Sequence, residues 1–248
     1  MSHTMRIMIL AAILGGCVSD RSTAPTEGAL KASGSAAPSA ADLPEFPPAE
    51  DFVPEIDNPY LGFARERIFT YAGETADGNE TILVEVTKES KTILGVVTTV
   101  VHDQAFLEGE LIEDTSDWFA QDGDGNVWYF GEKSYEIVNG AIVDSAGSWE
   151  AGVDGAVPGI FMLAEPKIGT QYQQEFYEGV AEDEAKVVSL SQEAEVPYGE
   201  FEDCLQTMEW SHLSPGARET KTYAFGVGMV LEMSRGGHDR IELTAIEN

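Results

Sequence analysis

The sequence predicts an all-β domain: an antiparallel meander of about ten or eleven strands that forms a curled sheet, a half-barrel or an open barrel. Past residue 57, short runs rich in β-branched and aromatic residues recur, and some of them alternate with a period of two. Turn-forming residues separate these runs, and no stretch of ten or more residues shows a persuasive helical period. A meander of this length must curl or split to bury its apolar face.

The first two strands are predicted at 67–71 and 81–87. Between them lies Asp77-Gly78, a dipeptide that favours a tight β-hairpin. A third run, at 92–101, is dominated by valine, isoleucine and threonine, which pack well on a pleated surface. The N-terminal third of the domain therefore reads as a series of hairpins.

Turn-forming residues also separate the later runs of the chain. Residues 107–111 contain a Glu-Gly turn, and Asn139-Gly140 joins the runs 135–138 and 141–143. Each turn connects neighbouring strands, so the predicted order in the sheet follows the order in the sequence.

The two cysteines have different expected roles. The stretch 201–210 around Cys204 is strand-like. If Cys17 carries lipid, as argued next, Cys204 has no disulfide partner. A lone buried cysteine acts as a small apolar side chain, so we expect Cys204 in the core.

The N-terminus has the pattern of an export signal. Arg6 precedes an apolar run at 7–14, which is too short to cross a bilayer as a mature helix. The segment 14–17, Leu-Gly-Gly-Cys, resembles the lipobox of bacterial lipoproteins. The resemblance implies cleavage before Cys17 and attachment of lipid, such as diacylglycerol and palmitate, to that cysteine. The alternative is an ordinary secretory signal with a chance cysteine.

The predicted organisation has three parts: a signal peptide at 1–16, a lipidated cysteine with a flexible spacer at 17–56, and one β-rich domain at 57–248. The spacer is rich in Ala, Ser, Pro and acidic residues and lacks aliphatic periodicity, so it cannot bury enough apolar surface to offset chain entropy. The alternative for its Pro-rich end, 43–48, is that it packs onto the domain.

The domain is strongly acidic. It contains 11 Lys and Arg and 37 Asp and Glu, which gives 11 − 37 = −26. Such a surface repels phosphate backbones, so nucleic acid is excluded as a partner. Solubility explains the charge; affinity for cations or basic partners is the alternative.

The C-terminal half carries a family resemblance. The motifs are Val-Pro-Tyr-Gly-Glu-Phe at 196–201 and Tyr-Ala-Phe-Gly-Val-Gly-Met-Val at 223–230. They resemble a set of uncharacterised bacterial lipoproteins whose sheets are similar to the curved half-barrel of the lipoprotein-carrier (Lol) proteins. These motifs are structural, since glycine permits tight turns, and the resemblance implies the fold without any catalytic residue.

The most pointed local motif is Asp122-Gly-Asp124-Gly-Asn126. Its alternating oxygen side chains resemble the first half of an EF-hand calcium loop. Val127 then stands where the glycine belongs, and Glu132 falls one residue short of the bidentate position. An EF-hand is excluded, and two hypotheses stay open: a looser calcium loop, or a plain hairpin turn.

Aromatic residues are dense on the two runs that flank this loop. Trp118, Trp128 and Phe130 are the candidate ligand-binding residues, because an aromatic face suits an apolar molecule. Packing in the core is the alternative for all three.

No enzyme signature is present. The domain has His102, His212 and His238, each isolated and without metal-ligand spacing. Neither a nucleophile elbow nor a phosphate-binding loop occurs. We therefore expect no catalytic residues, with a carboxylate-based hydrolase as the remaining enzymatic alternative.

These observations predict an exported, membrane-anchored lipoprotein of the outer membrane or cell surface, monomeric and attached through lipid on Cys17. Val18, in place of the aspartate that resembles an inner-membrane retention signal, favours the outer membrane. The expected function is a non-enzymatic binding module for an apolar or acyl ligand without a cofactor. The alternative is an adaptor that contacts envelope proteins, with calcium bound at 122–126.

Overall fold

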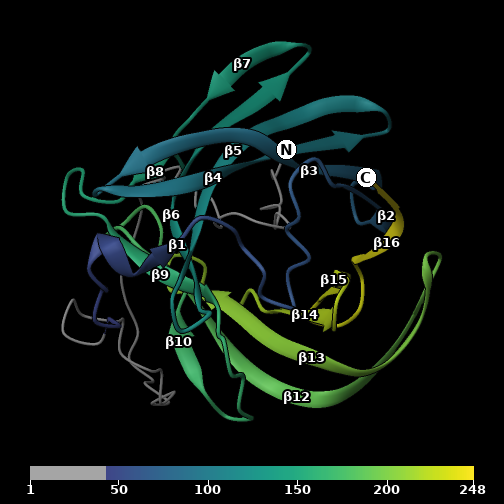
Figure 1. Cartoon of the computed structure of the whole chain (residues 1–248). Coiled ribbons are helices and arrows are strands. Elements are labelled where there is room, and N and C mark those ends of the chain that lie inside the picture. The colour runs from purple at the N-terminus through teal and green to yellow at the C-terminus, as the bar shows by residue number, and fades with distance from the viewer. Residues whose placement is uncertain (1–42) are drawn as a thin grey trace, which may run out of the picture.

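The computed structural model describes residues 43–248, which form sixteen strands and one short 3-10 helix (Figure 1). The elements are η1 (Ala49–Asp51), β1 (Phe52–Val53), β2 (Ile68–Thr75), β3 (Gly78–Ile93), β4 (Val96–Leu107), β5 (Glu110–Asp122), β6 (Val127–Val138), β7 (Ala141–Asp144), β8 (Trp149–Glu150), β9 (Val157–Met162), β10 (Gln171–Gln173), β11 (Glu175–Phe176), β12 (Asp183–Val196), β13 (Gly199–Ser211), β14 (Glu219–Ala224), β15 (Gly228–Ser234) and β16 (Arg240–Glu247).

The strands form one antiparallel sheet that curls into a nearly closed barrel (Figure 1). Thirteen of them follow one path, in the order β10-β12-β13-β14-β15-β16-β2-β3-β4-β5-β6-β9-β11. The predicted all-β meander is confirmed. The structure has more strands than the ten or eleven expected, because β1, β8, β10 and β11 have only two or three residues and show no periodicity in the sequence.

Two features close the barrel. β16 pairs with β2, so the last strand completes the wall beside the first long one. At the other end of the path, β10 pairs with β12 and β11 pairs with β9. Gln174 separates β10 from β11, so a single extended segment crosses from one edge of the sheet to the other. β10 and β11 are therefore the two ends of the strand path, and the seam between these ends is the one part of the described barrel that no strand ladder seals.

The predicted turns are present. β2 and β3 are joined by Ala76 and Asp77, with Gly78 as the first residue of β3, and β4 and β5 are joined at Glu108-Gly109. Asn139 and Gly140, between β6 and β7, have φ values of 52° and 74°. Two consecutive positive φ values belong to the hairpin turn that asparagine and glycine favour.

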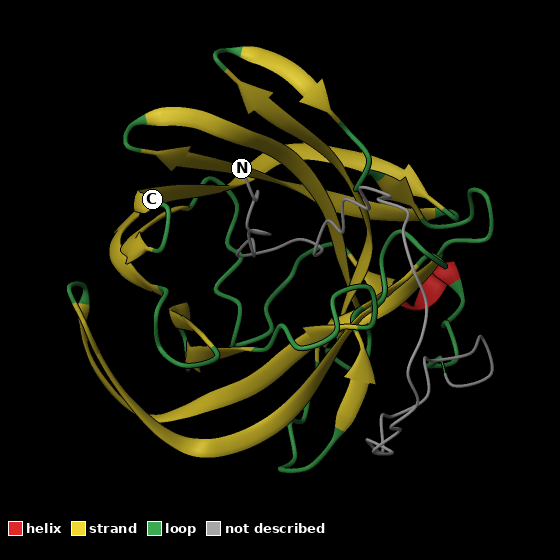
Figure 2. Cartoon of the chain, turned by 180° about the vertical axis from the view of Figure 1, so that it is seen from behind, coloured by secondary structure: helices red, strands yellow, loops and turns green. Residues whose placement is uncertain are grey.

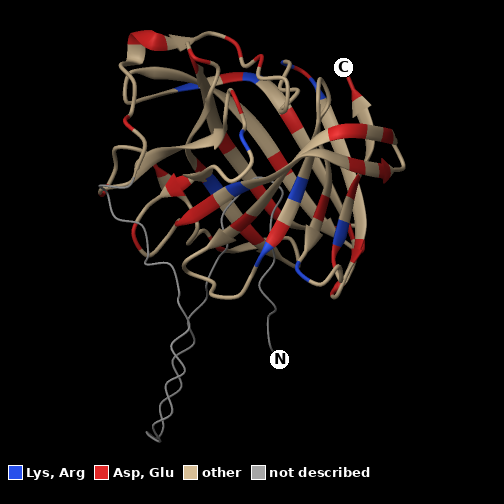
Figure 3. Cartoon of the chain, turned by 90° about the horizontal axis from the view of Figure 1, so that it is seen from below, with Lys and Arg blue, Asp and Glu red and all other residues tan. Residues whose placement is uncertain are grey.

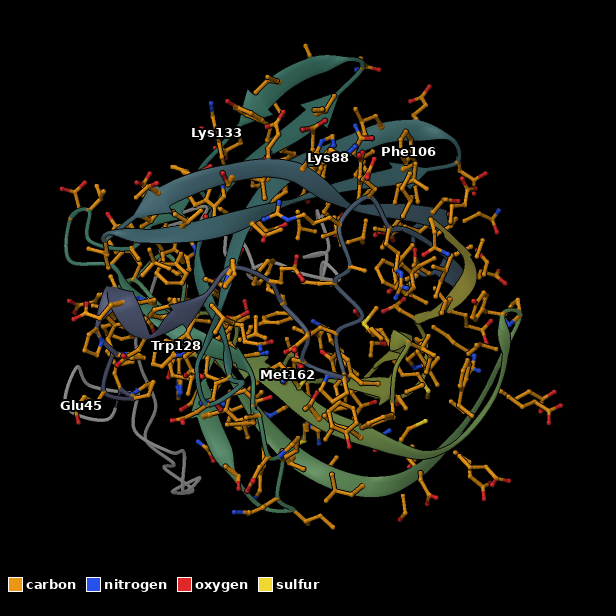
Figure 4. All side chains as sticks on the ribbon, in the orientation of Figure 1. Glu45, Lys88, Phe106, Trp128, Lys133 and Met162 are labelled. Carbon is orange, nitrogen blue, oxygen red and sulfur yellow. The ribbon has the colours of Figure 1, made fainter. Side chains whose placement is uncertain are left out.

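Buried and more exposed side chains alternate along the strands, and the buried ones fill the barrel. Phe69, Tyr71, Ile82 and Val84 on β2 and β3 are buried, whereas the residues between them are more exposed. Successive side chains point to opposite faces of a sheet, so these four residues point into the lumen. Side chains crowd the interior of the barrel (Figure 4). Cys204 is fully buried with a free thiol, as predicted.

The N-terminal part of the described chain packs on the outside of the barrel. Phe46 lies 5.5 Å from Trp128 and 5.8 Å from Phe130, measured between ring centroids. Phe52 lies 5.7 Å from Phe130, and β1 pairs with β5. The structured unit therefore begins before residue 57, and the Pro-rich end of the predicted spacer packs onto the domain. The apolar rings of Phe46 and Phe52 give this short segment apolar surface to bury.

Residues 57–63, called the strap below, cross one end of the barrel (Figures 1 and 2). Gln121 at the end of β5 holds one side, where its Oε1 accepts hydrogen bonds from the Asp57 and Asn58 amides at 3.0 and 2.8 Å. Pro59 holds the other side, where its carbonyl accepts from the Gly226 amide at 2.7 Å. Along the sheet path five strands separate β5 from β14, so the strap connects opposite walls.

Close backbone approach fixes the strap at Gly62. Its φ is +65°, and a Cβ placed there would lie 2.1 Å from the carbonyl oxygen of Val227. Only glycine satisfies both conditions without strain. Leu61 and Phe63, on either side of Gly62, are buried.

Candidate functional site

Acidic side chains are buried in the lumen of the barrel. Figure 3 shows how strongly acidic residues outnumber basic ones on its strands. The alternation that directs Phe69 and Tyr71 inward also directs a set of carboxyl groups inward, each no more than 8% exposed. They are Glu80, Asp103, Asp117, Glu132, Glu175, Glu209, Glu219 and Glu232. Burial of a carboxylate is costly unless it is paired or protonated, so this lumen is an unusual environment.

One cation balances part of this charge. Lys221 on β14 is the one buried lysine or arginine among residues 43–248. Its Nζ lies 3.0 Å from Glu209 Oε2 and 3.1 Å from Glu219 Oε1. Burial lowers the pKa of Lys221, but Glu209 and Glu219 outweigh that effect and hold the pKa well above its usual range. The ammonium group is therefore fixed and charged.

A second cluster lies on β5 and β6. The Tyr129 hydroxyl lies 2.7 Å from Asp117 Oδ1 and 3.0 Å from Glu132 Oε2. The hydroxyl has one hydrogen, so it donates to one carboxyl group and accepts from the other, which must be protonated. Burial, followed by the charges of Asp117 and Glu175, raises the pKa of Glu132 well above its usual range. Glu132 is therefore the protonated partner.

Burial raises the pKa of further acids in the lumen. The pKa values of Asp117 and Glu219 rise to about 7, chiefly because both groups are cut off from water. Glu113, at the edge of this set, reaches about 7 for the same reason, although the hydroxyls of Ser134 and Thr115 partly oppose the shift. Glu113, Asp117 and Glu219 consequently exchange protons near neutral pH.

Five carboxyl oxygens in this set have no hydrogen-bond partner within residues 43–248. They are Asp103 Oδ2, Asp117 Oδ2, Glu175 Oε1, Glu219 Oε2 and Glu232 Oε2. Native proteins leave few buried polar atoms unpaired, because each one costs about 1–3 kcal/mol. These oxygens therefore mark a region of the lumen that favours hydrogen-bond donors.

A small pocket lies between the strap and the lumen acids. Its lining is mostly apolar and combines Leu61 and Phe63 of the strap with Tyr71, Val84, Phe161, Tyr223 and Met229 of the barrel. The space open to a water-sized molecule is about 20 Å³, which fits one water. A larger occupant requires displacement of the strap.

The aromatic residues predicted to bind a ligand are buried in packing contacts. Trp128 and Phe130 lie beneath Phe46 and Phe52, and Figure 4 shows Trp128 beside η1. Trp118 lies under Lys91, whose Nζ is 3.3 Å from the ring centroid. These contacts match the packing alternative, and the open pocket is lined by other residues.

The loop at 122–126 is a hairpin turn built around one carboxylate. Asp122 Oδ1 accepts hydrogen bonds from the amides of Asp124 and Asn126 at 3.0 and 2.9 Å. Its Oδ2 accepts from Asn126 Nδ2 at 3.0 Å and from Trp128 Nε1 at 2.7 Å. Asn126 Oδ1 accepts from the Ala164 amide at 2.9 Å. A cation at this loop would have to displace these donors, and residues 43–248 contain no group of three or more acidic, His or Cys side chains arranged to hold a metal ion.

We expect the substitution Asp122→Ala to lower the free energy of unfolding by about 1–3 kcal/mol, because it leaves the buried Trp128 indole N–H unpaired. Asp124→Ala is the matched control, since Asp124 is exposed and contributes its backbone amide to the turn. Urea unfolding with and without millimolar calcium measures both variants. A calcium-dependent stabilisation that disappears in Asp122→Ala would instead support the calcium loop.

The histidines do not join the lumen acids. His102 lies on the outer face of β4, where its Nε2 is 3.1 Å from Asp114 Oδ1. His212 Nε2 is 3.0 Å from Glu184 Oε2, whose residue pairs with Trp210 across β12 and β13. His238 lies in the exposed turn between β15 and β16.

Sequence reasoning missed the buried lumen acids and Lys221. With 37 acidic residues in the domain, no single pair stands out. A usable signal is the alternation of Glu219, Lys221 and Tyr223, which puts a lysine and a glutamate on the same face as a core tyrosine.

Cys17 and the signal peptide at 1–16 lie outside the described residues. Within residues 43–248, no helix has the length and apolar character needed to cross a bilayer.

Comparisons with known proteins give structural likeness only. No family model and no curated protein matches the chain. A predicted exported protein with a YmcC-like fold from Bacteroides fragilis matches at 14% identity and a TM-score of 0.44, over 76% of this chain and 99% of that one. A predicted lipoprotein from Parabacteroides distasonis matches at 11% identity and a TM-score of 0.43, over 77% and 99%. A β-barrel-like protein from Brucella abortus, with a domain of unknown function, matches at 12% identity and a TM-score of 0.35, over 73% and 96%.

Proposed function

We propose that the chain is a membrane-anchored, non-enzymatic envelope lipoprotein that binds a small apolar ligand in the pocket beneath the strap. The anchor rests on the lipobox resemblance at 14–17 and on Cys17. Two of the solved structures similar to the chain are predicted to be exported or lipid-modified. Their likeness agrees with this part of the proposal without carrying it.

The observation that carries the binding function is the composition of the pocket. Leu61 and Phe63 come from a strap that is not part of the sheet, and Val84, Phe161 and Met229 come from the barrel wall. The strap and the barrel wall meet at an apolar surface and leave a small space between them. If the two layers separate, an apolar molecule can enter that space.

The strap is the movable layer. Its connection to one wall runs through the Gln121 side chain and through Asn58 Nδ2, which donates to the carbonyls of Gly125 and Leu163 at 3.0 and 3.2 Å. Its connection to the other wall includes the hydrogen bond from the Gly226 amide to the Pro59 carbonyl. These are separate side-chain and turn contacts and not a continuous strand ladder, so we infer that the strap opens more readily than the strands separate. A long acyl chain would require a far larger opening than a short alkyl group, since the closed pocket has room for about one water.

Titration of the full chain, purified in neutral detergent, with straight-chain alcohols from propanol to octanol tests this function. Affinity should rise by about 0.8 kcal/mol for each methylene group that becomes buried, until the pocket is filled. Tryptophan fluorescence or calorimetry would record the series. Alcohol binding that is absent, or independent of chain length, would contradict an apolar site.

A matched pair of strap variants locates the site. Leu61→Phe adds volume to the side chain that lines the pocket, and it should weaken the binding of the longest alcohols most. Tyr60→Phe is the control, because Tyr60 packs against the exposed Phe225, at 5.8 Å between ring centroids, and does not line the pocket.

A further inference from the structure

The pocket beneath the strap adjoins the acidic lumen. Val84, which lines the pocket, pairs directly with Asp103 across β3 and β4. Paired residues of neighbouring strands point to the same face, so the Asp103 carboxyl group lies beside the apolar wall. Tyr223, on the opposite wall of the pocket, has its hydroxyl 3.4 Å from Glu209 Oε1. The pocket therefore has an apolar lining, and the two acids that lie next to Val84 and Tyr223 of that lining, Asp103 and Glu209, are called its acidic floor.

Asp103 is the acid of this floor that most requires a partner. It is 2% exposed, and its Oδ2 has no hydrogen-bond partner among residues 43–248. Asp117 Oδ2 on the next strand is likewise unpaired. A buried acceptor of this kind gains most from a donor that also carries positive charge.

The lumen already holds one such donor. Lys221 Nζ, a primary ammonium group, bridges Glu209 and Glu219 on β13 and β14. Within residues 43–248, Lys221 forms its ion pairs with Glu209 and Glu219 and none with Asp103 or Asp117 of the wall formed by β4 and β5, and no other lysine or arginine is buried. The acids of that wall are not clustered to hold a metal ion, so a single ammonium group matches them better than a metal does.

We propose that the ligand of this pocket is a small organic amine, with its ammonium group at Asp103 and its apolar part between the strap and Phe161. This inference rests on the proposed binding function and specifies the class of ligand. The amine supplies hydrogen-bond donors and one positive charge to the floor, and its alkyl part covers the apolar surface of Leu61 and Phe63.

Binding of the amine is coupled to release of a proton. Burial, followed by the charge of Asp117, raises the pKa of Asp103 well above its usual range, so the empty lumen favours the protonated form of Asp103. The ammonium group of the amine favours the ionised form of Asp103, so Asp103 releases its proton when the amine binds. An alkylamine itself keeps its charge below about pH 10. Affinity for the amine should therefore rise with pH for as long as the amine keeps its charge. The titratable groups that act on Asp103 are Asp117 and Glu113 of β5, Glu80 of β3, Lys221 of β14 and Tyr71 of β2.

Calorimetric titration of the full chain in neutral detergent with hexylamine, hexanol and hexanoate tests the inference. The three probes share an alkyl chain and differ in the charge of the head group. Hexylamine should bind about tenfold more tightly than hexanol or better, and hexanoate should bind least. Equal affinity for hexylamine and hexanol would overturn the amine assignment and leave the apolar site intact, whereas failure of all three to bind would overturn both.

Variants on one strand pair locate the head group. Asp103→Asn keeps the size of the side chain and removes its ability to ionise, so it should abolish the preference for hexylamine over hexanol. Glu85→Gln is the matched control, because Glu85 neighbours Val84 but lies exposed on the outer face of β3. Unchanged hexanol binding shows that Asp103→Asn is folded. A preference for hexylamine that survives in that variant would place the ammonium group elsewhere and overturn the assignment.

Discussion

Replacing Lys221 with methionine is expected to lower the free energy of unfolding by about 3–5 kcal/mol near pH 8. The lysine is 4% exposed and bridges Glu209 and Glu219, and its loss leaves buried carboxylates without their counter-charge. Methionine has a similar length, so the loss of charge dominates the effect. Urea unfolding followed by circular dichroism measures the change.

An exposed lysine provides the comparison. Lys88 forms an ion pair with Glu66, in which both side chains are more than half exposed. Lys88→Met should change stability by at most about 1 kcal/mol, because exposed pairs contribute little. The Lys221 variant should also regain part of its loss near pH 5, where Glu219 takes up a proton. If the two substitutions have equal effects, Lys221 does not neutralise the lumen.

The second large effect is on the pH dependence of the wild-type protein. We expect the barrel to be more stable near pH 5 than near pH 8. Glu113, Asp117 and Glu219 have folded-state pKa values of about 7, above the unfolded values of about 4. Between these two values the folded state binds more protons than the unfolded state, so the free energy of unfolding falls as the pH rises from about 4 to about 7 and levels off above that.

Denaturant midpoints measured across this range test the sign, and Asp117→Asn tests the origin. Because asparagine does not titrate, this variant should show a flatter pH profile than the wild type. Asp114→Asn, whose carboxyl group lies on the outer face between His102 and Gln104, should retain the wild-type slope. A wild-type profile that rises toward pH 8 would show that the lumen acids are ionised in the folded protein.

The sequence predicts the strands and turns of this barrel better than the side chains that fill its lumen. Hairpins at Asp77-Gly78 and Asn139-Gly140 follow from local turn chemistry, which needs no knowledge of distant residues. The buried position of Cys204 follows from its strand-like surroundings. The degree of closure does not follow, because it depends on β16 pairing with β2 across the whole length of the domain.

The acidic floor is hard to predict for a different reason. Residues 113–117 are polar at nearly every position, so alternation alone does not show which face of β5 is buried. The strap cannot be predicted from the sequence either, because an irregular segment that crosses a barrel shows no periodic pattern of apolar residues. The sequence predicts Trp128 and Phe130 as ligand-binding residues, with core packing as the alternative, and it does not reveal that Phe46 and Phe52 cover them.

The pairing of β2 with β16 has a consequence for how the molecule is made. Arg240 and Glu74, partners in that ladder, are far apart along the chain, so contacts of high sequence separation complete the fold. Such contacts form slowly, because a long loop must close before they stabilise anything. While residues 240–247 are still inside the ribosome, β2 of the nascent chain therefore has no partner on its β16 side. Completion of the wall awaits the final strand, and a nascent chain can remain open for as long as that strand is withheld.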